Sequence, residues 1–337
     1  MISVRGKESP FKAVTIRVND LCKWIAVVMG MGKSAKNKLS FNDNTILGPK
    51  WIYRGQANSG WEISSSFERN ILSKAPEPMK QNEHGLRAIE KMAMINFQRW
   101  ADAPKQSSPL TNGEWLALMQ HHCVPTRLVD FTEIPLIALG FALEDDKQEE
   151  SDFAIWAVMR YSFNCEYAKE EAFHVACDGQ KKIILHDNLR FRVCAEECDR
   201  NMFEKILDIE NEVPSTPFLM RYNPIGLNQR QKLQRGLFLV GSHLTEKFMP
   251  LLHKWTDTSA VDFKNADLEF YVGDVLKEDG LFVDTVAVAH IIKFVFDKAL
   301  RKDARVLLEI CNIGPRTRYG DNDRVAEVTK MMMQDCL

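Results

Sequence analysis

The sequence predicts an α+β fold in which helices flank one central sheet, mixed or antiparallel. Apolar segments of strand length at 51–55, 152–160, 235–242 and 290–297 are separated by segments with helical periodicity. The late strands also have a hairpin-like arrangement, which a purely parallel sheet would not show. We therefore expect a single domain over residues 1–337, with a variable helical or irregular insertion at about 161–222.

The first elements are predicted from caps and periodicity. A helix at about 20–29 has Asn19 or Asp20 as its N-cap, and two glycines at 30 and 32 are expected to end it. A polar loop follows, and then the short strand at 51–55. Apolar residues at 86, 89, 92, 93 and 97 predict an amphipathic helix over 83–101.

Prolines set the boundaries of the next helices. The helix that begins at 114 is expected to end before Pro125, since the residue before a proline avoids helical angles. Thr132 is the expected N-cap of a helix over 133–145, with Pro135 in its first turn. The segment 152–160 is apolar on both faces, as a fully buried strand would be. Two further helices are predicted at 298–314, closed by Gly314, and at 322–334.

Composition excludes several classes of protein. The net charge of −2 gives no overall electrostatic signature of nucleic-acid binding. The N-terminal residues show no apolar core typical of a secretion signal, and no apolar segment is long enough to span a membrane, so we expect a cytoplasmic protein with no membrane partner. The eight cysteines are scattered, and the close pair Cys194 and Cys198 lacks a second pair of ligands, so no metal is expected.

The first candidate functional segment is WIYRGQ at 51–56. An apolar strand ends here on Arg54, which is followed at once by Gly55 and Gln56. A surface turn would explain this pattern. The alternative is that the strand holds Arg54 at the mouth of a pocket, where the glycine allows a ligand to approach the backbone and the guanidinium binds an anion.

The second segment, QHHCVPTRLVDFT at 120–132, is the densest in polar groups. We expect it to be a connection between two apolar helices that presents a base, a cation, a carboxylate and hydroxyls. Arg127 and Asp130 are three residues apart and are expected to pair. His122 is of the right type for proton transfer or phosphate binding. The alternative is a structural ion pair next to histidines that only end a helix.

The third segment is NQRQKLQRGLF at 228–238. Polar residues, among them Arg230 and Gln234, lead through Gly236 into an apolar strand. This again places polar groups and a glycine at the edge of a strand, where a ligand can come close to the backbone. Taken alone, the segment is also compatible with a solvated turn.

Together these three segments resemble the FRG domain, which is named for a Phe/Tyr-Arg-Gly motif. The resemblance rests on WIYRGQ with WEISSSFER, on QHHCVPTRLVDFTEIPLIALGFA and on NQRQKLQRGLF, and it extends over about 15–330 with an unusual middle at 161–222. The sequence departs from the family at Cys123, where glycine is usual, and at Tyr319–Asp321, where Phe-Pro-Asp is commoner. Such proteins occur in bacteria, phage and mobile elements near defence or toxin modules, which implies an effector role.

A weaker resemblance is to ADP-ribosyltransferases, whose first core strand often ends in Tyr-Arg-Gly. It implies a fold of that kind and NAD as a substrate, with Arg54 on the phosphates and Gln234 near the scissile bond. Their Glu-x-Glu or Gln-x-Glu motif is absent near Gln234. The candidate catalytic residues are His122, Asp130 and Gln234. The candidate ligand-binding residues are Tyr53, Arg54, Gly55, Gln56, Gln120, His121, Thr126, Arg127, Thr132 and Arg230.

Two other functions remain open at this point. The same pocket in a non-catalytic domain would sense a nucleotide or bind a phosphorylated partner. A nucleic-acid-directed enzyme is the third possibility, based on the basic segments 181–192 and 230–235. A protein or nucleic-acid target is compatible with each of these functions.

Overall fold

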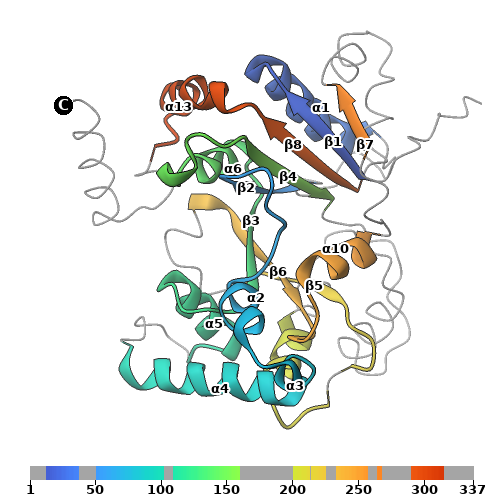
Figure 1. The fold of residues 1–337 in the computed structure, drawn as a ribbon, viewed down its shortest axis with the longest axis vertical. Coiled ribbons are helices and arrows are strands. Elements are labelled where there is room, and N and C mark those ends of the chain that lie inside the picture. Colours follow the sequence, from blue (N-terminus) through green and yellow to red (C-terminus); the bar gives the residue numbers. More distant parts are fainter. Residues whose placement is uncertain are drawn as a thin grey trace, which may run out of the picture.

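The described strands of the computed structural model form one eight-stranded sheet, in the order β5-β6-β3-β2-β4-β8-β1-β7 (Figure 1). β1 pairs in parallel with β7 and β8, whereas the other neighbouring strands are antiparallel, so the sheet is mixed as predicted. The structure describes residues 13–37, 51–101, 109–159, 200–212, 214–224, 233–256, 264–267 and 290–314. The strands are β1 Ala13–Val18, β2 Trp51–Gln56, β3 Leu128–Thr132, β4 Phe153–Met159, β5 Leu219–Tyr222, β6 Gly236–Gly241, β7 Lys264–Asp267 and β8 Ile291–Phe296.

The sheet is weakly connected at one place, the junction of β2 and β3. β2 pairs with β4 along its whole length, but it pairs with β3 only through Tyr53 and Thr132. β3 in turn pairs with β6 along its whole length. The sheet therefore has two halves, one that contains β2 and one that contains β3, and Figure 1 shows the β3 half running down and away from the β2 half.

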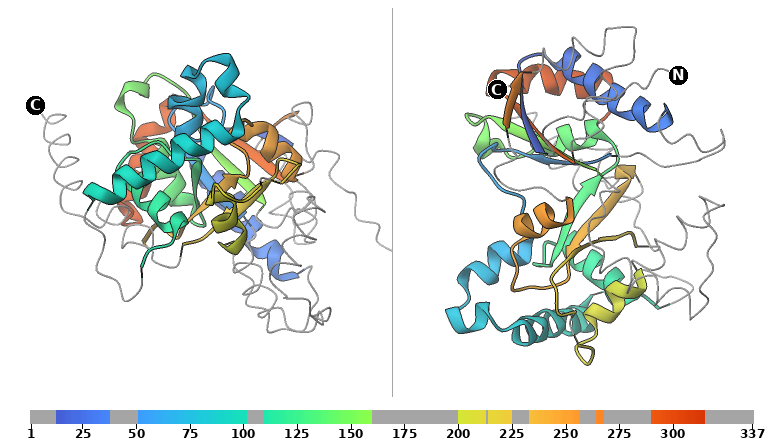
Figure 2. Two further views of the ribbon diagram at one scale, coloured as in Figure 1. Left: turned by 90° about the horizontal axis from the view of Figure 1, so that it is seen from below. Right: turned by 90° about the vertical axis from the view of Figure 1, so that its right-hand side faces the viewer.

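Helices cover both faces of the sheet (Figure 2). On one face, α1, α6 and α13 pack on the β2 half, while α4, α5 and the helical residues 200–207 pack on the β3 half. On the opposite face, α10 packs on side chains from both halves. The α-helices are α1 Leu21–Asn37, α2 Ser66–Asn70, α3 Glu77–Lys80, α4 Glu83–Trp100, α5 Asn112–His121, α6 Pro135–Ala142, α10 Phe248–Thr256 and α13 Arg301–Ile310, and short 3-10 helices lie at Leu72–Lys74, Asp146–Gln148 and Lys298–Leu300. None of the helices in the described ranges is both long and apolar enough to cross a lipid bilayer.

Local chemistry explains where several helices begin. The Thr111 hydroxyl accepts from the Glu114 backbone N–H and the Glu114 carboxylate accepts from the Thr111 N–H, which is a complete capping box for α5. Asn82 caps α4 by accepting from the Gly85 N–H. Pro135 begins α6, where its missing N–H leaves no helical hydrogen bond unmade.

Gly55 allows α6 to lie directly on β2. A Cβ atom at this position would be 1.9 Å from the backbone oxygen of Ala138 and 2.7 Å from the backbone nitrogen of Ala142. Both atoms belong to the α6 backbone, which cannot move aside as a flexible side chain would. The glycine of the WIYRGQ segment is therefore required by packing, whatever else it does.

Four of the predicted strands are confirmed as β2, β4, β6 and β8, and β4 is buried along its whole length. The predicted helices at 83–101, 133–145 and 298–314 correspond to α4, α6 and α13, the last of these preceded by a 3-10 turn. β1, β5 and β7 were not predicted. The predicted helix at 322–334 lies outside the described residues.

Three predictions about local structure were wrong. α1 continues through both glycines to Asn37, so glycine alone did not end it. The connection between α5 and α6 contains the strand β3, whose five residues were not recognised because a charged residue interrupts its apolar pattern. Thr132 is the last residue of this strand and not the N-cap of α6, which is Ile134.

The packing at Gly55 leads to a stability prediction. We expect Gly55→Ala to lower the free energy of unfolding by about 3 kcal/mol or to prevent folding, because the added methyl group overlaps the α6 backbone. Gly314→Ala is the matched control, since a Cβ there meets nothing within 4 Å, and it should change stability by less than about 0.5 kcal/mol. Urea unfolding followed by circular dichroism measures both, and equal stabilities of the two variants would contradict the close contact.

Candidate functional site

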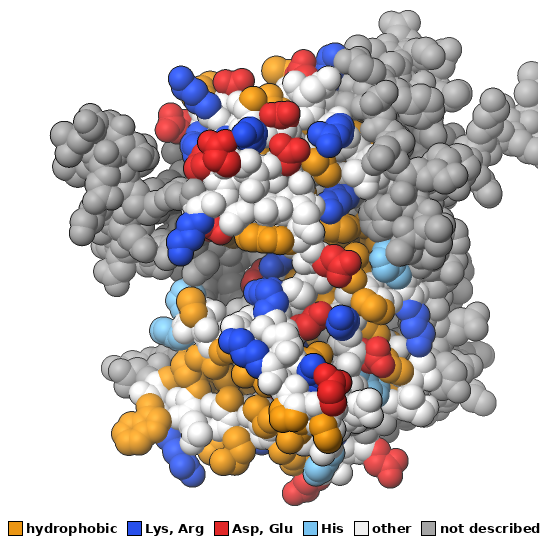
Figure 3. Space-filling view, viewed as in Figure 1, with side chains coloured by type: hydrophobic (Ala, Val, Ile, Leu, Met, Phe, Trp, Pro, Cys, Tyr) orange, Lys and Arg blue, Asp and Glu red, His pale blue; other side chains and the backbone are white. Residues whose placement is uncertain are grey.

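A cavity of about 220 Å³ lies where β2 and β3 part, and α5 and α6 contribute to its walls. Figure 3 shows this face hollowed at mid-height, with basic side chains in the hollow and histidines at its edge. The fold opens here because α5 and α6 cover different halves of the sheet. The cavity is lined by Tyr53, Arg54, Gly55, Ala117, Gln120, His121, Asp130, Phe131, Thr132, Phe141, Glu144, Gln234 and Phe238.

Arg54, on β2, forms a hydrogen bond to β3 next to the point where the two strands stop pairing. Its Nη1 donates to the backbone oxygen of Asp130 at 2.7 Å and lies 4.0 Å from the carboxylate oxygen Oδ2 of the same residue. Its Nε is buried and makes no hydrogen bond within the described residues. Burial lowers the pKa of Arg54 and the Asp130 carboxylate opposes that effect, but an arginine stays charged in either case.

Asp130 is held by a short relay of hydrogen bonds. Its Oδ2 accepts from the Gln120 side-chain N–H at 2.6 Å, and the Gln120 Oε1 accepts from the Thr126 hydroxyl. The Thr126 oxygen also accepts from the Leu128 N–H, so its proton is available for the Gln120 oxygen. Thr126 therefore turns the Gln120 amide so that its N–H groups face Asp130.

Thr132 and Gln234 join the end of β3 to the residues before β6. The Thr132 hydroxyl donates to the backbone oxygen of Gln234 at 2.5 Å and accepts from the Ile134 N–H at 3.0 Å. Both side chains line the cavity, although Thr132 is only 1% exposed and Gln234 only 8%. The Thr132 hydroxyl and the Gln234 backbone are thus held together at the cavity wall.

Two further residues of the cavity wall contribute a phenol and a carboxylate. Burial raises the pKa of Tyr53 far above its usual value, so this phenol stays neutral. Glu144 lies just after α6 and adds a second carboxylate to the cavity. Sequence reasoning missed Glu144, because an acidic residue after an apolar helix is ordinary and nothing nearby marks it as functional.

Eight of the twelve predicted site residues that the structure describes line this cavity, and four do not. Gln56 bonds the Trp156 indole and the Glu62 backbone, away from the cavity. His122 forms the C-cap of α5 and is exposed. Thr126 is fully buried and acts only through Gln120. Arg230 lies outside the described residues, as do all of 181–192.

Arg127, the fourth of these, has a structural role instead. The predicted pair with Asp130 is wrong, because successive residues of β3 alternate in direction and Arg127 precedes the strand by one residue. Arg127 is 3% exposed, and its Nη2 lies 2.6 Å from a carboxylate oxygen of Glu90, which is 5% exposed. Its Nη1 also donates to the Ser242 backbone oxygen. It therefore joins β3 to α4 and to the end of β6.

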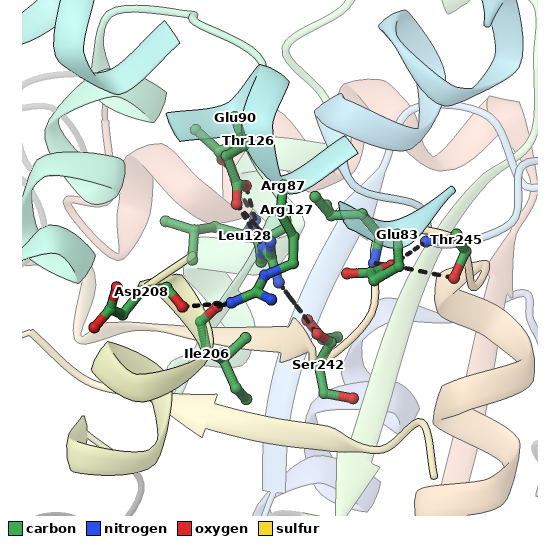
Figure 4. A network of polar contacts seen from close by, with 12 residues as sticks. Glu83, Arg87, Glu90, Thr126, Arg127, Leu128, Ile206, Asp208, Ser242 and Thr245 are labelled. Carbon is green, nitrogen blue, oxygen red and sulfur yellow. Dashed lines mark hydrogen bonds and ion pairs between the residues drawn. The ribbon is translucent and has the colours of Figure 1, made fainter. Parts of the chain in front are cut away.

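The Glu90–Arg127 pair belongs to a larger network along one stripe of α4 (Figure 4). Glu83 accepts from the backbone N–H groups of Leu244 and Thr245 at 2.7 and 3.0 Å. Arg87 donates to the backbone oxygens of Ile206 and Asp208. These charges are spaced by one helical turn, so α4 holds three separate segments against the β3 half of the sheet.

Cys123 is one of the departures from the FRG pattern, and its backbone has a conformation that glycine adopts more readily. This residue has a φ of 60°, in the left-handed region that favours glycine. It lies directly after the C-cap of α5, a position where glycine is common because it ends a helix without a Cβ clash. Within the described ranges, no three His, Cys, Asp or Glu side chains gather in a way that would hold a metal ion.

The structural role of Arg127 is testable. Arg127→Met leaves the Glu90 charge buried and unpaired, so we expect it to lower the free energy of unfolding by about 3–5 kcal/mol. The double variant Glu90→Leu/Arg127→Met should recover much of this loss, because neither charge remains. Arg305→Met, which removes an exposed partner of Glu149, should cost at most about 1 kcal/mol. A double variant as unstable as Arg127→Met in urea titrations would show that the charge is not the cause.

Comparison with known families places this geometry in context. Residues 49–151 match the family model of the FRG domain. This segment contains β2, β3 and α2 to α6, and most of the cavity wall with them. No match was found among curated proteins or among solved structures. The segment that holds Arg54, Asp130 and Glu144 is therefore an FRG domain, completed into one sheet by strands from both sides of it.

Proposed function

We propose that the cavity binds NAD and that the protein is an ADP-ribosyltransferase-like enzyme that cleaves its nicotinamide–ribose bond. One observation carries the proposal. The parted strands bring a guanidinium, Arg54, into the same cavity as two carboxylates, Asp130 and Glu144. Thr132 adds a hydroxyl held by hydrogen bonds, and Gln234 adds an amide.

The charges in the cavity favour a ligand that has both a negative and a positive group. A simple phosphate would be attracted to Arg54 but repelled by the two carboxylates in the same small space. NAD has a negative pyrophosphate and a positively charged nicotinamide ring. With the pyrophosphate at Arg54 and the ring near the two carboxylates, each of the three charged side chains would have an opposite charge nearby. The planar guanidinium can also bind phosphate oxygens in pairs.

The chemistry follows from this arrangement. The bond between the nicotinamide nitrogen and the ribose C1′ breaks, and its electron pair goes to the nitrogen. Positive charge then develops at C1′ and the ring oxygen, where a carboxylate stabilises it. An acceptor nucleophile forms the new bond to C1′ and loses its proton. Asp130 or Glu144 would supply the carboxylate, and Gln234 would orient the ribose.

A non-catalytic role in nucleotide sensing is the second candidate. It is favoured by how firmly the polar groups hold one another, since Gln120 bridges Asp130 and Thr126, and Thr132 binds the backbone before β6. Such a rigid site binds a ligand without a large cost of ordering. The two candidates share Arg54 as the phosphate-binding group and differ only in whether nicotinamide is released.

Binding and turnover of NAD test both candidates. With NAD at 100 times its Kd, the folded protein should gain about 2.7 kcal/mol of stability in thermal unfolding. Arg54→Lys should weaken NAD binding about 10- to 100-fold, because an ammonium cannot reproduce the paired hydrogen bonds. Asp130→Asn and Glu144→Gln should bind NAD but lose nicotinamide release. Arg305→Lys, on the exposed surface of α13, is the control.

The outcomes separate the alternatives. Stabilisation by NAD with no release of nicotinamide from the wild-type protein would favour the sensor. Absence of both binding and turnover, in protein shown to be folded by circular dichroism, would remove NAD as the ligand. Equal affinity of the wild-type and Arg54→Lys proteins would show that the arginine serves the strand junction alone.

A further inference from the structure

A row of ring side chains on α4 and α5 extends from the wall of the cavity. It begins at His121, which lines the cavity. The His121 and His122 ring centroids are 5.1 Å apart, those of His122 and Phe97 5.7 Å, and those of Phe97 and Trp115 6.4 Å. These four residues, His121, His122, Phe97 and Trp115, form what we call the ring row.

The ring row has a rigid base and an open end. Phe97 of α4 and Trp115 of α5 are partly buried and pack against the hydrophobic core on the β3 half of the sheet. His122 is exposed, and within the described residues its ring nitrogens make no hydrogen bond. A catalytic histidine is normally oriented by a partner on its second nitrogen. The geometry therefore favours a stacking role for His122 over the proton-transfer role that the sequence indicated.

The size of the cavity explains why an outer subsite is needed. Pockets that enclose drug-sized ligands usually measure about 300–1,000 Å³, and this one is about 220 Å³. A dinucleotide cannot be contained in it and has to continue beyond its edge. His121 belongs both to the cavity wall and to the ring row, so the exposed ring of His122 is the next surface beyond the cavity edge.

We propose that the ring row binds the adenine base of the dinucleotide, with His122 as its outer stacking surface. This inference rests on the proposed function. A neutral, planar base needs an aromatic face and not a charge, because aromatic side chains stack on any base through its π face. The carboxylates of Asp130 and Glu144, which line the cavity itself, would then face the nicotinamide end. The adenine would thus lie beyond the cavity edge, and the charged parts of the ligand within the cavity.

The experiment compares a dinucleotide with a mononucleotide. Isothermal titration would give the Kd of NAD and of nicotinamide mononucleotide for the wild-type protein, His122→Ala and His122→Phe. We expect His122→Ala to weaken NAD binding about tenfold, which is the loss of one stacked base, and to leave the mononucleotide within about twofold. His122→Phe should restore NAD affinity, since a phenyl ring stacks but cannot transfer a proton.

His84→Ala is the matched control, because His84 is also an exposed histidine but lies in the first turn of α4. It should bind both ligands as the wild-type protein does. Thermal unfolding of all variants without ligand checks that the fold is kept.

Several results would overturn the inference. If the wild-type protein binds NAD and His122→Ala binds it equally well, the adenine lies elsewhere while the proposed function stands. An equal loss for NAD and the mononucleotide would place His122 at the cavity instead of at the adenine. Failure of His122→Phe to restore binding would exclude stacking. If the wild-type protein binds neither ligand but retains a single-stranded oligonucleotide through His122 with a steep dependence on salt, both proposals fail and the row is a nucleic-acid surface.

Discussion

The site depends on one constraint, the loss of strand pairing between β2 and β3 after Tyr53 and Thr132. Each strand keeps a full ladder with its other neighbour, so the sheet stays intact while this junction opens. The parting leaves the Asp130 backbone oxygen without a strand partner from β2, and Arg54 donates to it instead. The arginine therefore stabilises the opening that it also lines.

The surrounding packing keeps this opening rigid. α6 lies on the β2 half in direct contact with Gly55, whereas α5 lies on the β3 half. α10 spans the opposite face and joins the two halves through their side chains. The buried Glu90–Arg127 pair attaches β3 to α4, because two charges in such a place are tolerable only together. A fixed frame of this kind reduces the cost of ordering a ligand.

The candidate site could be predicted only in part. Arg54 and its glycine were recognised because an arginine at the end of an apolar strand is a local pattern. Glu144 was missed, since its distance from Arg54 along the chain gives no sign that one cavity contains both. Arg127 was expected to pair with Asp130, because that carboxylate lies three residues away. Its real partner, Glu90, is 37 residues distant in sequence, and the choice between the two is made by the direction of β3.

The sequence by itself determined the α+β class, four of the strands and the helices α4, α6 and α13, because the periodicity of apolar residues acts over a few residues. Only the tertiary structure decided which arginine is buried in an ion pair and which reaches a cavity. The residues next to Arg54 and Arg127 in the chain carry no signal that separates these two roles. Their roles depend on which strands pair and where pairing stops, and these are contacts between residues far apart in the chain.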